Sequence, residues 1–341
     1  MIVGLDVGTN YTKATKDGKN VVIFPSLVVY SEERDWSLKG EVKKVYIGNE
    51  AIPAIQTMEN AEVLRPLHEG RVIHQSFIEI AKHALNVLNI RGGVIATGLP
   101  SKSSRKEREE VMNSLKRALN SDILIFPQSV GSLAYMGYKT GVCVDIGFGT
   151  TDVVVLYDME YLKGDTMLMG VDSIYNNLEV AIRNAYGISI TPEEMAKLLL
   201  ERDYEVGRIR SGKKIVIKHE HVMPTYNEIV KGWVDRIVNR VKMLLEGLST
   251  SIVEKIVLTG GGSLLPNVYD EFARRFSDIA KVERPDDPLG ANAKGFYKLA
   301  KLIKGEEIES VEKSQPVEVA KEVKEVKEAE EEKEKKVIKK K

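Results

Sequence analysis

The chain has 341 residues, 43% of them hydrophobic, and its 50 basic side chains balance its 50 acidic ones. This length and apolar content predict a globular protein with two medium-sized domains. A formal net charge of zero argues against a protein that binds nucleic acid through bulk electrostatics. The single Cys143 excludes a disulfide framework, and no apolar run approaches the roughly 18 residues of a membrane span. We therefore expect a cytoplasmic protein that neither binds nucleic acid directly nor enters a membrane.

The first motif, LDVGTNYTK, begins in an apolar strand predicted over residues 2–7 and carries a carboxylate at Asp6. A charge among the apolar residues of a strand opposes folding, so its presence suggests a ligand. The alternative is that Asp6 ends the strand and caps the turn at Gly8. Because further strands are predicted at 11–16 and 21–24, the motif reads as a β-hairpin with a polar tip.

The segment that follows alternates helices and strands. Apolar residues at helical spacing predict helices over 76–90, with Ser76 as N-cap, and over 105–120. Strands are predicted at 93–98 and 122–126. Gln128 comes directly after the last of these strands, at the edge where the strand carboxyl ends of an α/β sheet gather and bind ligands. The alternative is an ordinary loop glutamine.

A second motif, VDIGFGTTDVVVL at 144–156, repeats the pattern of the first. Strands are predicted at 142–146 and 151–157, with Asp145 in the place of Asp6 and Asp152 in the place of Lys13. Two matched hairpins this far apart in the chain indicate two similar half-domains rather than a solenoid.

The last third of the chain contains a glycine run. A buried strand predicted at 254–259 leads into Gly260, Gly261 and Gly262, which could let the backbone approach a flat ligand, although a flexible loop is the alternative. Helices are predicted over about 225–247, 265–276 and 290–303. The two histidines of KHEHV, at 218–222, are expected in an exposed polar strand rather than a metal site, since no third ligand cluster is visible.

Taken in order, these motifs resemble the nucleotide site of the actin-like ATPases. LDVGTNYTK resembles the first phosphate loop, PQSVGSLAYMG the first connecting helix, VDIGFGTTD the second phosphate loop, LTGGGSLLPN the adenosine loop, and DDPLGANAKGFYKLA the second connecting helix. Within that superfamily the chain is most similar to the compact prokaryotic actins, the ParM-like proteins and the archaeal actin homologues. The resemblance implies an α/β fold of two ribonuclease-H-like, actin-fold domains that flank a nucleotide cleft.

The resemblance also implies the division of the chain. Residues 1–140 plus 286–304 would form domain I, with a small insertion at about 27–75. Residues 141–285 would form domain II, with an insertion at about 172–230. The residues from 305 to 341 are mostly Glu, Lys, Val and Ala, a composition that predicts a charged tail without a core.

Carried over residue by residue, the resemblance implies ATP and Mg²⁺ as cofactors. Asp6 and Asp145 would hold the metal, because a divalent cation removes the repulsion between two carboxylates. Gln128 would orient the attacking water, with Asp152 as a second candidate for that role and Asp145 also counted as catalytic. The remaining nucleotide contacts would come from Gly8, Thr9, Asn10, Lys13, Gly147, Gly149, Thr150, Gly260, Gly261 and Gly262. The ribose contacts are expected on a helix between about 190 and 250.

The implied function is an ATPase that forms nucleotide-dependent filaments from copies of itself, in DNA or plasmid segregation through an adaptor protein, or in cytoskeletal organisation. Filament formation rests on family analogy alone, because polymer surfaces are not visible as motifs. Two alternatives stay open. One is a small-molecule kinase on the same fold, and the other is a nucleotide-bound scaffold like FtsA or PilM with little turnover.

Overall fold

A computed structural model of the chain describes residues 1–30, 45–57 and 62–305. The chain divides into two units, Met1–Glu306 and Glu307–Lys341. Everything that follows concerns the first unit. Residues 306–341 of the predicted tail, and 31–44 and 58–61 of the first predicted insertion, lie outside the described residues.

The first sheet has five strands in the order β10-β9-β1-β2-β3. β1 pairs antiparallel with β2 and parallel with β9, while β3 extends the β2 edge and β10 the β9 edge. The bounds are β1 Ile2–Val7, β2 Tyr11–Thr15, β3 Val22–Pro25, β9 Val94–Leu99 and β10 Asp122–Pro127. The five predicted strands are confirmed, each end within one residue.

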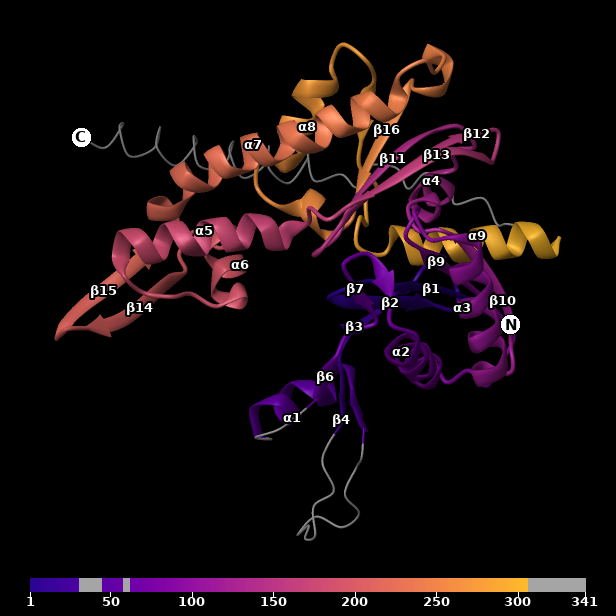
Figure 1. The fold of residues 1–341 in the computed structure, drawn as a ribbon, viewed down its shortest axis with the longest axis horizontal. Helices are drawn as coiled ribbons and strands as arrows, with labels where there is room; N and C mark the ends of the chain where they lie inside the picture. Colours follow the sequence, from indigo (N-terminus) through magenta and orange to yellow (C-terminus); the bar gives the residue numbers. More distant parts are fainter. Residues whose placement is uncertain (31–44, 58–61, 306–341) are drawn as a thin grey trace, which may run out of the picture. The chain divides into compact units, whose positions relative to one another are not determined.

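Both faces of β1 are buried, which explains its nearly continuous apolar sequence. Val3, Leu5 and Val7 pack with helices α2 (His74–Val87) and α3 (Arg105–Leu119) in one core. Ile2 faces the opposite way and shares a core with α4 (Val130–Met136) and α9 (Ala291–Lys304), of which α9 lies near β9 in Figure 1. Because side chains alternate along a strand, Asp6 shares the face of Ile2 rather than that of the α2 core.

The predicted N-cap of the first helix is wrong. α2 begins at His74, with Ile73 at the N-cap position and no side-chain cap. Ser76 lies inside the first turn, where its hydroxyl donates to the carbonyl oxygens of Arg65 (2.9 Å) and Ile73 (3.1 Å). The Ser76 hydroxyl, which the sequence predicted would cap the helix, therefore donates to the backbone of another segment instead.

The second sheet repeats the first, with five strands in the order β13-β12-β11-β16-β17. Its central strand β11 pairs antiparallel with β12 and parallel with β16, as β1 does with β2 and β9. The bounds are β11 Gly141–Ile146, β12 Thr151–Tyr157, β13 Glu160–Met167, β16 Lys255–Thr259 and β17 Lys281–Glu283. The predicted strands are again confirmed, and the two half-domains share one topology.

The helices of the second half pack over one face of this sheet around a large core that includes Tyr226, Trp233 and Phe272. Their bounds are α5 Val171–Tyr186, α6 Pro192–Leu200, α7 His219–Leu245 and α8 Val268–Phe276. The prediction of an exposed strand at 218–222 is wrong, since only Lys218 ends a strand and α7 begins at His219. The helix starts early because the buried Val222 and Tyr226 extend its apolar stripe toward the N-terminus.

Smaller elements occupy the two predicted insertions. After β3 come a three-stranded antiparallel sheet, a short helix and a small hairpin whose two strands have two residues each. A longer hairpin follows α6. Their bounds are β4 Val28–Tyr30, β5 Val45–Ile47, η1 Gly48–Glu50, α1 Ala51–Thr57, β6 Glu62–Leu64, β7 Leu67–His68, β8 Arg71–Val72, β14 Glu205–Arg210 and β15 Lys213–Lys218. The exact domain boundaries stay a prediction.

Candidate functional site

The two predicted phosphate loops have the same turn geometry. In the first, the Gly8 N–H donates to the Tyr11 carbonyl (3.2 Å), and in the second the Gly147 N–H donates to that of Thr150 (2.8 Å). The strand register places Asp6 opposite Lys13. In each hairpin, strand pairing alone therefore places an aspartate directly opposite the residue seven positions later in the chain.

The structure brings the two hairpins together. A Cβ atom added to Gly149, in the second turn, would lie 3.6 Å from the Thr9 side chain in the first. The charges interact as well, because Asp6 helps to raise the pKa of Asp145. Residues from two distant parts of the chain thus form one polar site.

Asp6 is 3% exposed, and each of its carboxylate oxygens has a partner. Lys13 Nζ lies 3.3 Å from Oδ2, and Gln128 Nε2 donates to Oδ1 over 2.9 Å. Gln128 stands directly after β10, at the sheet edge that the sequence predicted. This amide therefore lies in the site, beside the first aspartate.

Asp145 is 6% exposed and lacks a cationic ion-pair partner within the described residues. Asn292 Nδ2, from α9, donates to its Oδ2 over 2.6 Å. Burial, followed by the neighbouring Asp6 charge, raises the pKa of Asp145 to about 7. Asp145 is therefore costly to keep ionised without a cation.

Asn292 is a site residue that sequence reasoning missed. Its Oδ1 accepts hydrogen bonds from the Ser132 N–H (3.0 Å) and hydroxyl (2.7 Å) of α4, so the amide links both connecting helices to Asp145. An asparagine at the start of the helix after DDPLG was the available signal. Its role becomes visible only when the two helices, which are far apart in the sequence, pack against each other.

Asp152 lies opposite Asp145 in the strand register and is 3% exposed. Its Oδ1 accepts from the Ser101 N–H (2.9 Å) and the Thr166 hydroxyl (2.6 Å). Its Oδ2 accepts from the hydroxyls of Ser101 (2.6 Å) and Ser129 (2.7 Å). Burial raises the pKa of Asp152, and these hydrogen bonds oppose the shift. Both oxygens are thus engaged by protein donors.

The glycine run follows β16 and lies against the end of β11. Gly260 has a φ of 80°, and a Cβ there would lie 2.3 Å from Asp145 Oδ1, so only glycine fits. A Cβ on Gly262 would lie 2.1 Å from the Ile146 side chain. The run continues into a 3₁₀ turn, η3 (Gly261–Leu264), and α8 begins at Val268, three residues later than predicted. The backbone therefore does approach the site closely.

Arg65 also reaches the first phosphate loop and was not predicted. One guanidinium nitrogen donates to the Thr9 carbonyl oxygen and to Asn10 Oδ1, both at 3.1 Å. The residue as a whole is exposed, but burial lowers the pKa of its guanidinium, and within the described ranges no carboxylate pairs with it. The signal was an arginine before the LHEG turn, which alone does not indicate where its side chain points.

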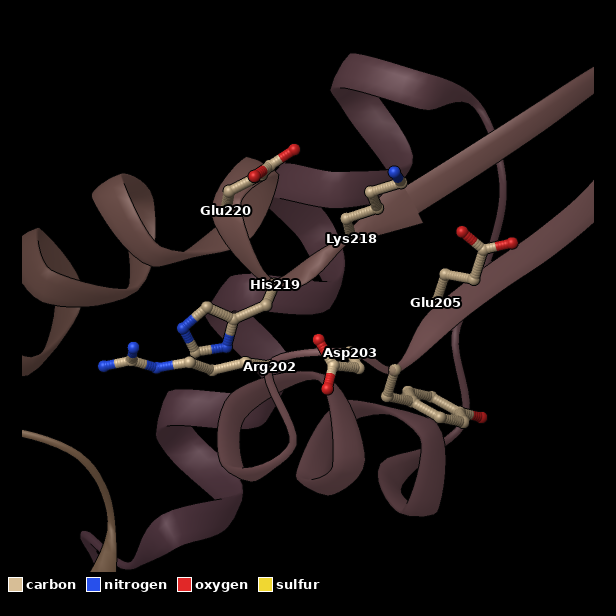
Figure 2. Close-up of a pocket in the computed structure, with 7 residues that line it drawn as sticks. Arg202, Asp203, Glu205, Lys218, His219 and Glu220 are labelled. Carbon is tan, nitrogen blue, oxygen red and sulfur yellow. The ribbon is translucent and has the colours of Figure 1, made fainter. Parts of the chain in front are cut away.

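A cavity of about 470 Å³ lies elsewhere in the second half, where β15 runs into α7 (Figure 2). Its lining is Arg202, Asp203, Tyr204, Glu205, Lys218, His219 and Glu220. His219 Nδ1 lies 2.8 Å from the Leu198 carbonyl oxygen, so this ring nitrogen is engaged. Within residues 1–30, 45–57 and 62–305, no group of three or more His, Cys, Asp and Glu side chains could hold a metal. None of the predicted site residues lines this cavity.

The helices that the structure describes are all too short or too polar to cross a membrane.

Comparison with known proteins decides the family. Residues 1–308 match the family described as MreB/Mbl protein. The chain belongs to the MreB/Mbl family. The predicted resemblance to prokaryotic actins is thereby confirmed. The chain is an actin-like protein of a prokaryotic cytoskeletal family.

Two curated relatives match this MreB/Mbl chain over most of their length. An archaeal actin homolog of Thermoplasma volcanium is 25% identical over a gapped alignment of 342 positions, which covers 88% of this chain and 99% of the relative. The cell shape-determining protein MreB of Escherichia coli is 23% identical over a gapped alignment of 334 positions, which covers 88% of this chain and 93% of that protein.

Solved structures confirm the actin fold of this MreB/Mbl protein. MreB5 of Spiroplasma citri bound to AMPPNP superposes with a TM-score of 0.70 at 20% identity, covering 89% of this chain and 97% of that one. A MamK double helical filament gives a TM-score of 0.70 at 18% identity, covering 88% and 98%. The two-domain fold predicted from the motifs is therefore correct.

Proposed function

We propose that this chain binds ATP with Mg²⁺ between its two hairpins, hydrolyses it, and assembles into nucleotide-dependent filaments. The observation that carries the proposal is the meeting of Asp6 and Asp145, from separate sheets, beside Lys13 and Gln128. Two buried carboxylates next to a lysine and an amide suit a metal-bound polyphosphate.

The residues present fit a magnesium ion. Asp6 and Asp145 supply carboxylate oxygens, the ligands that Mg²⁺ prefers, and burial with mutual repulsion raises the pKa of Asp145 in the absence of a cation. We propose that these two side chains hold a hydrated Mg²⁺ beside the β- and γ-phosphates. When bound, the ion would neutralise charge that develops on the phosphate oxygens.

The turn residues would bind the phosphates. Since the N–H groups of Gly8 and Gly147 close their own turns, we assign those glycines a shaping role. The donors we propose are the backbone N–H groups and hydroxyls of Thr9, Asn10, Gly149 and Thr150, with Lys13 as a point charge. We propose that Gly260, Gly261 and Gly262 line the adenosine, because their backbone lies beside Asp145 and Ile146.

Gln128 is the residue we propose to position the attacking water. Its side chain already lies on Asp6, next to the proposed metal, and it is fixed by the end of β10. A loose phosphoryl-transfer transition state needs an oriented water more than a strong base, which an amide can provide.

Filament formation is supported by family membership and by likeness to MamK, which has been solved as a double helical filament. Head-to-tail contacts that do not close into a ring generate filaments. We propose cytoskeletal organisation as the cellular role. Segregation of DNA through an adaptor protein remains the alternative for the cargo.

The test combines phosphate release with pelleting of the full chain in ATP, a slowly hydrolysed analogue or ADP, each with Mg²⁺. We expect phosphate release, and polymer in ATP or the analogue at concentrations well above micromolar. Asp145→Ala is the control and should lose metal-dependent nucleotide binding. Binding without phosphate release or polymer would indicate a scaffold instead, and phosphate transfer to an added small molecule would indicate a kinase.

A further inference from the structure

We propose that Asp152 is a positioning residue that holds Gln128 in place for hydrolysis. The inference rests on the proposed ATPase function. Its basis is the set of four hydrogen bonds that the Asp152 carboxylate accepts, three of them from residues that follow strands of the first sheet.

These three hydrogen bonds come from the two segments that frame Gln128. Ser129 is its direct neighbour in the chain, and Ser101 lies two residues beyond the end of β9. The Gln128 N–H donates to the Leu99 carbonyl oxygen over 2.8 Å. A Cβ added to Gly98 would lie 2.8 Å from the Gln128 Cα atom, so β9 presses directly on this residue. Asp152 therefore anchors both the Gln128 turn and the segment that supports it.

Among the described residues, the Asp152 carboxylate is surrounded by neutral donors only, which is unusual for a contact with a purely structural role. Asp152 is buried, and no lysine or arginine pairs with it in the part of the chain that the structure describes. The nearby cations Lys102 and Arg240 pair with Asp165 instead. A buried carboxylate stabilised only by neutral donors carries a desolvation cost that an apolar side chain would avoid. Such a cost is typical of functional sites.

The strand register shows where the Asp152 carboxylate lies relative to Asp145. Asp152 on β12 lies opposite Asp145 on β11, so the second sheet presents the metal ligand and the anchor at the same level. Through Ser129, the anchor fixes the Gln128 turn of the first sheet at that level. A direct role in water positioning would require a water to displace one of the four donors.

The first variant is Asp152→Asn, which keeps the shape but replaces one accepting oxygen with an NH₂ group that faces two donors. We expect kcat for phosphate release to fall by about tenfold or more, with ATP affinity changed by less than about threefold. The matched control is Thr166→Val, which removes the donor within the second sheet, together with a weak acceptor for the Lys102 N–H (3.4 Å), and leaves the three bonds of Asp152 to residues that follow strands of the first sheet. It should cost thermal stability but retain most of kcat.

A double variant separates positioning from a merely structural role. If Asp152 acts through Gln128, Asp152→Asn should cause no further loss of kcat in a Gln128→Ala background. Ser129→Ala, a milder change that removes only the hydroxyl beside Gln128, should lower kcat at unchanged affinity. It serves as the test variant if Asp152→Asn does not fold.

The outcomes distinguish this inference from the proposed function. A wild-type chain that hydrolyses ATP while Asp152→Asn and Ser129→Ala retain full kcat would overturn the anchor alone. Multiplicative losses in the double variant would show that Asp152 acts independently of Gln128 and would also overturn it. A wild-type chain that binds ATP without any hydrolysis would overturn both.

Discussion

Three buried carboxylates lie in the site, and each is compensated in a different way. Asp6 has a lysine and an amide, and Asp152 has four neutral donors. Within the described residues Asp145 accepts one side-chain hydrogen bond, from Asn292, and its pKa is raised to about 7. The least compensated carboxylate is the one that gains most from a cation. This difference supports Asp145 as a ligand and Asp152 as an anchor.

At the level of single residues, Gln128→Ala should separate chemistry from binding. We expect hydrolysis to fall roughly tenfold to a thousandfold, a loss of about 1.4 to 4 kcal/mol of transition-state stabilisation. ATP affinity should stay nearly intact, because the amide donates to Asp6 and its proposed contact is with the attacking water rather than with phosphate. Polymers should then live longer, since hydrolysis would be what destabilises them.

Nucleotide affinity and phosphate release should be measured for Gln128→Ala and Asp145→Ala side by side. The second variant should lose metal-dependent binding as well as turnover. Equal losses of affinity in the two would make Gln128 a binding or structural residue. Unchanged hydrolysis in Gln128→Ala would remove it from the mechanism.

Arg65→Ala should weaken ATP binding more than ADP binding. The guanidinium is held on the first phosphate loop by one nitrogen and lacks a carboxylate partner among the described residues, so its charge is available to a phosphate. We expect ATP affinity to fall about tenfold to a hundredfold, the range of one charge-assisted contact. Titration with both nucleotides measures it, and Arg71→Ala, on the neighbouring strand β8, is the matched control. Equal losses for ATP and ADP would contradict a contact to the terminal phosphate.

At the level of elements, helices α4 and α9 cross at very short range. A Cβ on Gly295 of α9 would lie 1.7 Å from the Gly131 carbonyl oxygen of α4. Side chains of both sheets share one core with these helices, including Ala96 and Val257. The close crossing places Asn292 between Ser132 and Asp145. Small residues in both helices are therefore a requirement of the site as well as of packing.

Strand β13 carries a pH-dependent ion pair. Asp165 is buried, Arg240 Nε lies 2.5 Å from its Oδ2, and Lys102, which follows β9, pairs with its Oδ1. Burial alone would raise the pKa of Asp165, but the two cations outweigh it and the pKa is lowered. The unfolded chain therefore binds the proton first, so this contribution to stability is complete above about pH 4 and is lost as pH falls through the folded pKa.

Asp165→Asn should accordingly cost about 1.5–3 kcal/mol of unfolding free energy at pH 7, the value of hydrogen bonds to a charged group. The difference from wild type should shrink as the pH is lowered toward 3. Urea unfolding at several pH values measures it, and Asp158→Asn, in an exposed turn, is the control. A difference that is constant with pH would show that the carboxylate charge does not contribute.

Sequence reasoning succeeded where a local pattern decides the structure. The eight predicted strands were correct to within one residue because apolar runs bounded by glycine and polar turns determine them, whereas β13 and β17 of the second sheet were not predicted. It failed at Ser76 and at the start of α7, where tertiary partners such as the Arg65 carbonyl and the buried core around Val222 decide. Asn292 and Arg65 were missed for the same reason, because their meaning depends on elements distant in the chain.

At the level of the whole molecule, the two sheets have the same strand order and the same pattern of parallel and antiparallel pairs. Each contributes one hairpin, one aspartate and one proposed phosphate turn to the site. A nucleotide site built between two such halves would respond to their relative motion, because the proposed contacts come from both. This arrangement would allow hydrolysis to alter the contacts between neighbouring copies in a filament.

The last prediction concerns the tail. A chain that ends at Gly305 should bind ATP with wild-type affinity. The site residues lie between Asp6 and Asn292, and the family match ends at residue 308. Beyond it, the sequence has mixed charge and no aromatic residue, so it offers little that could pack into the site. Nucleotide titration and thermal unfolding of the shortened and full chains measure this, while pelleting reports any change in filament bundling. Loss of ATP binding in a folded, shortened chain would show that the tail is structural and that the boundary at 305 is misplaced.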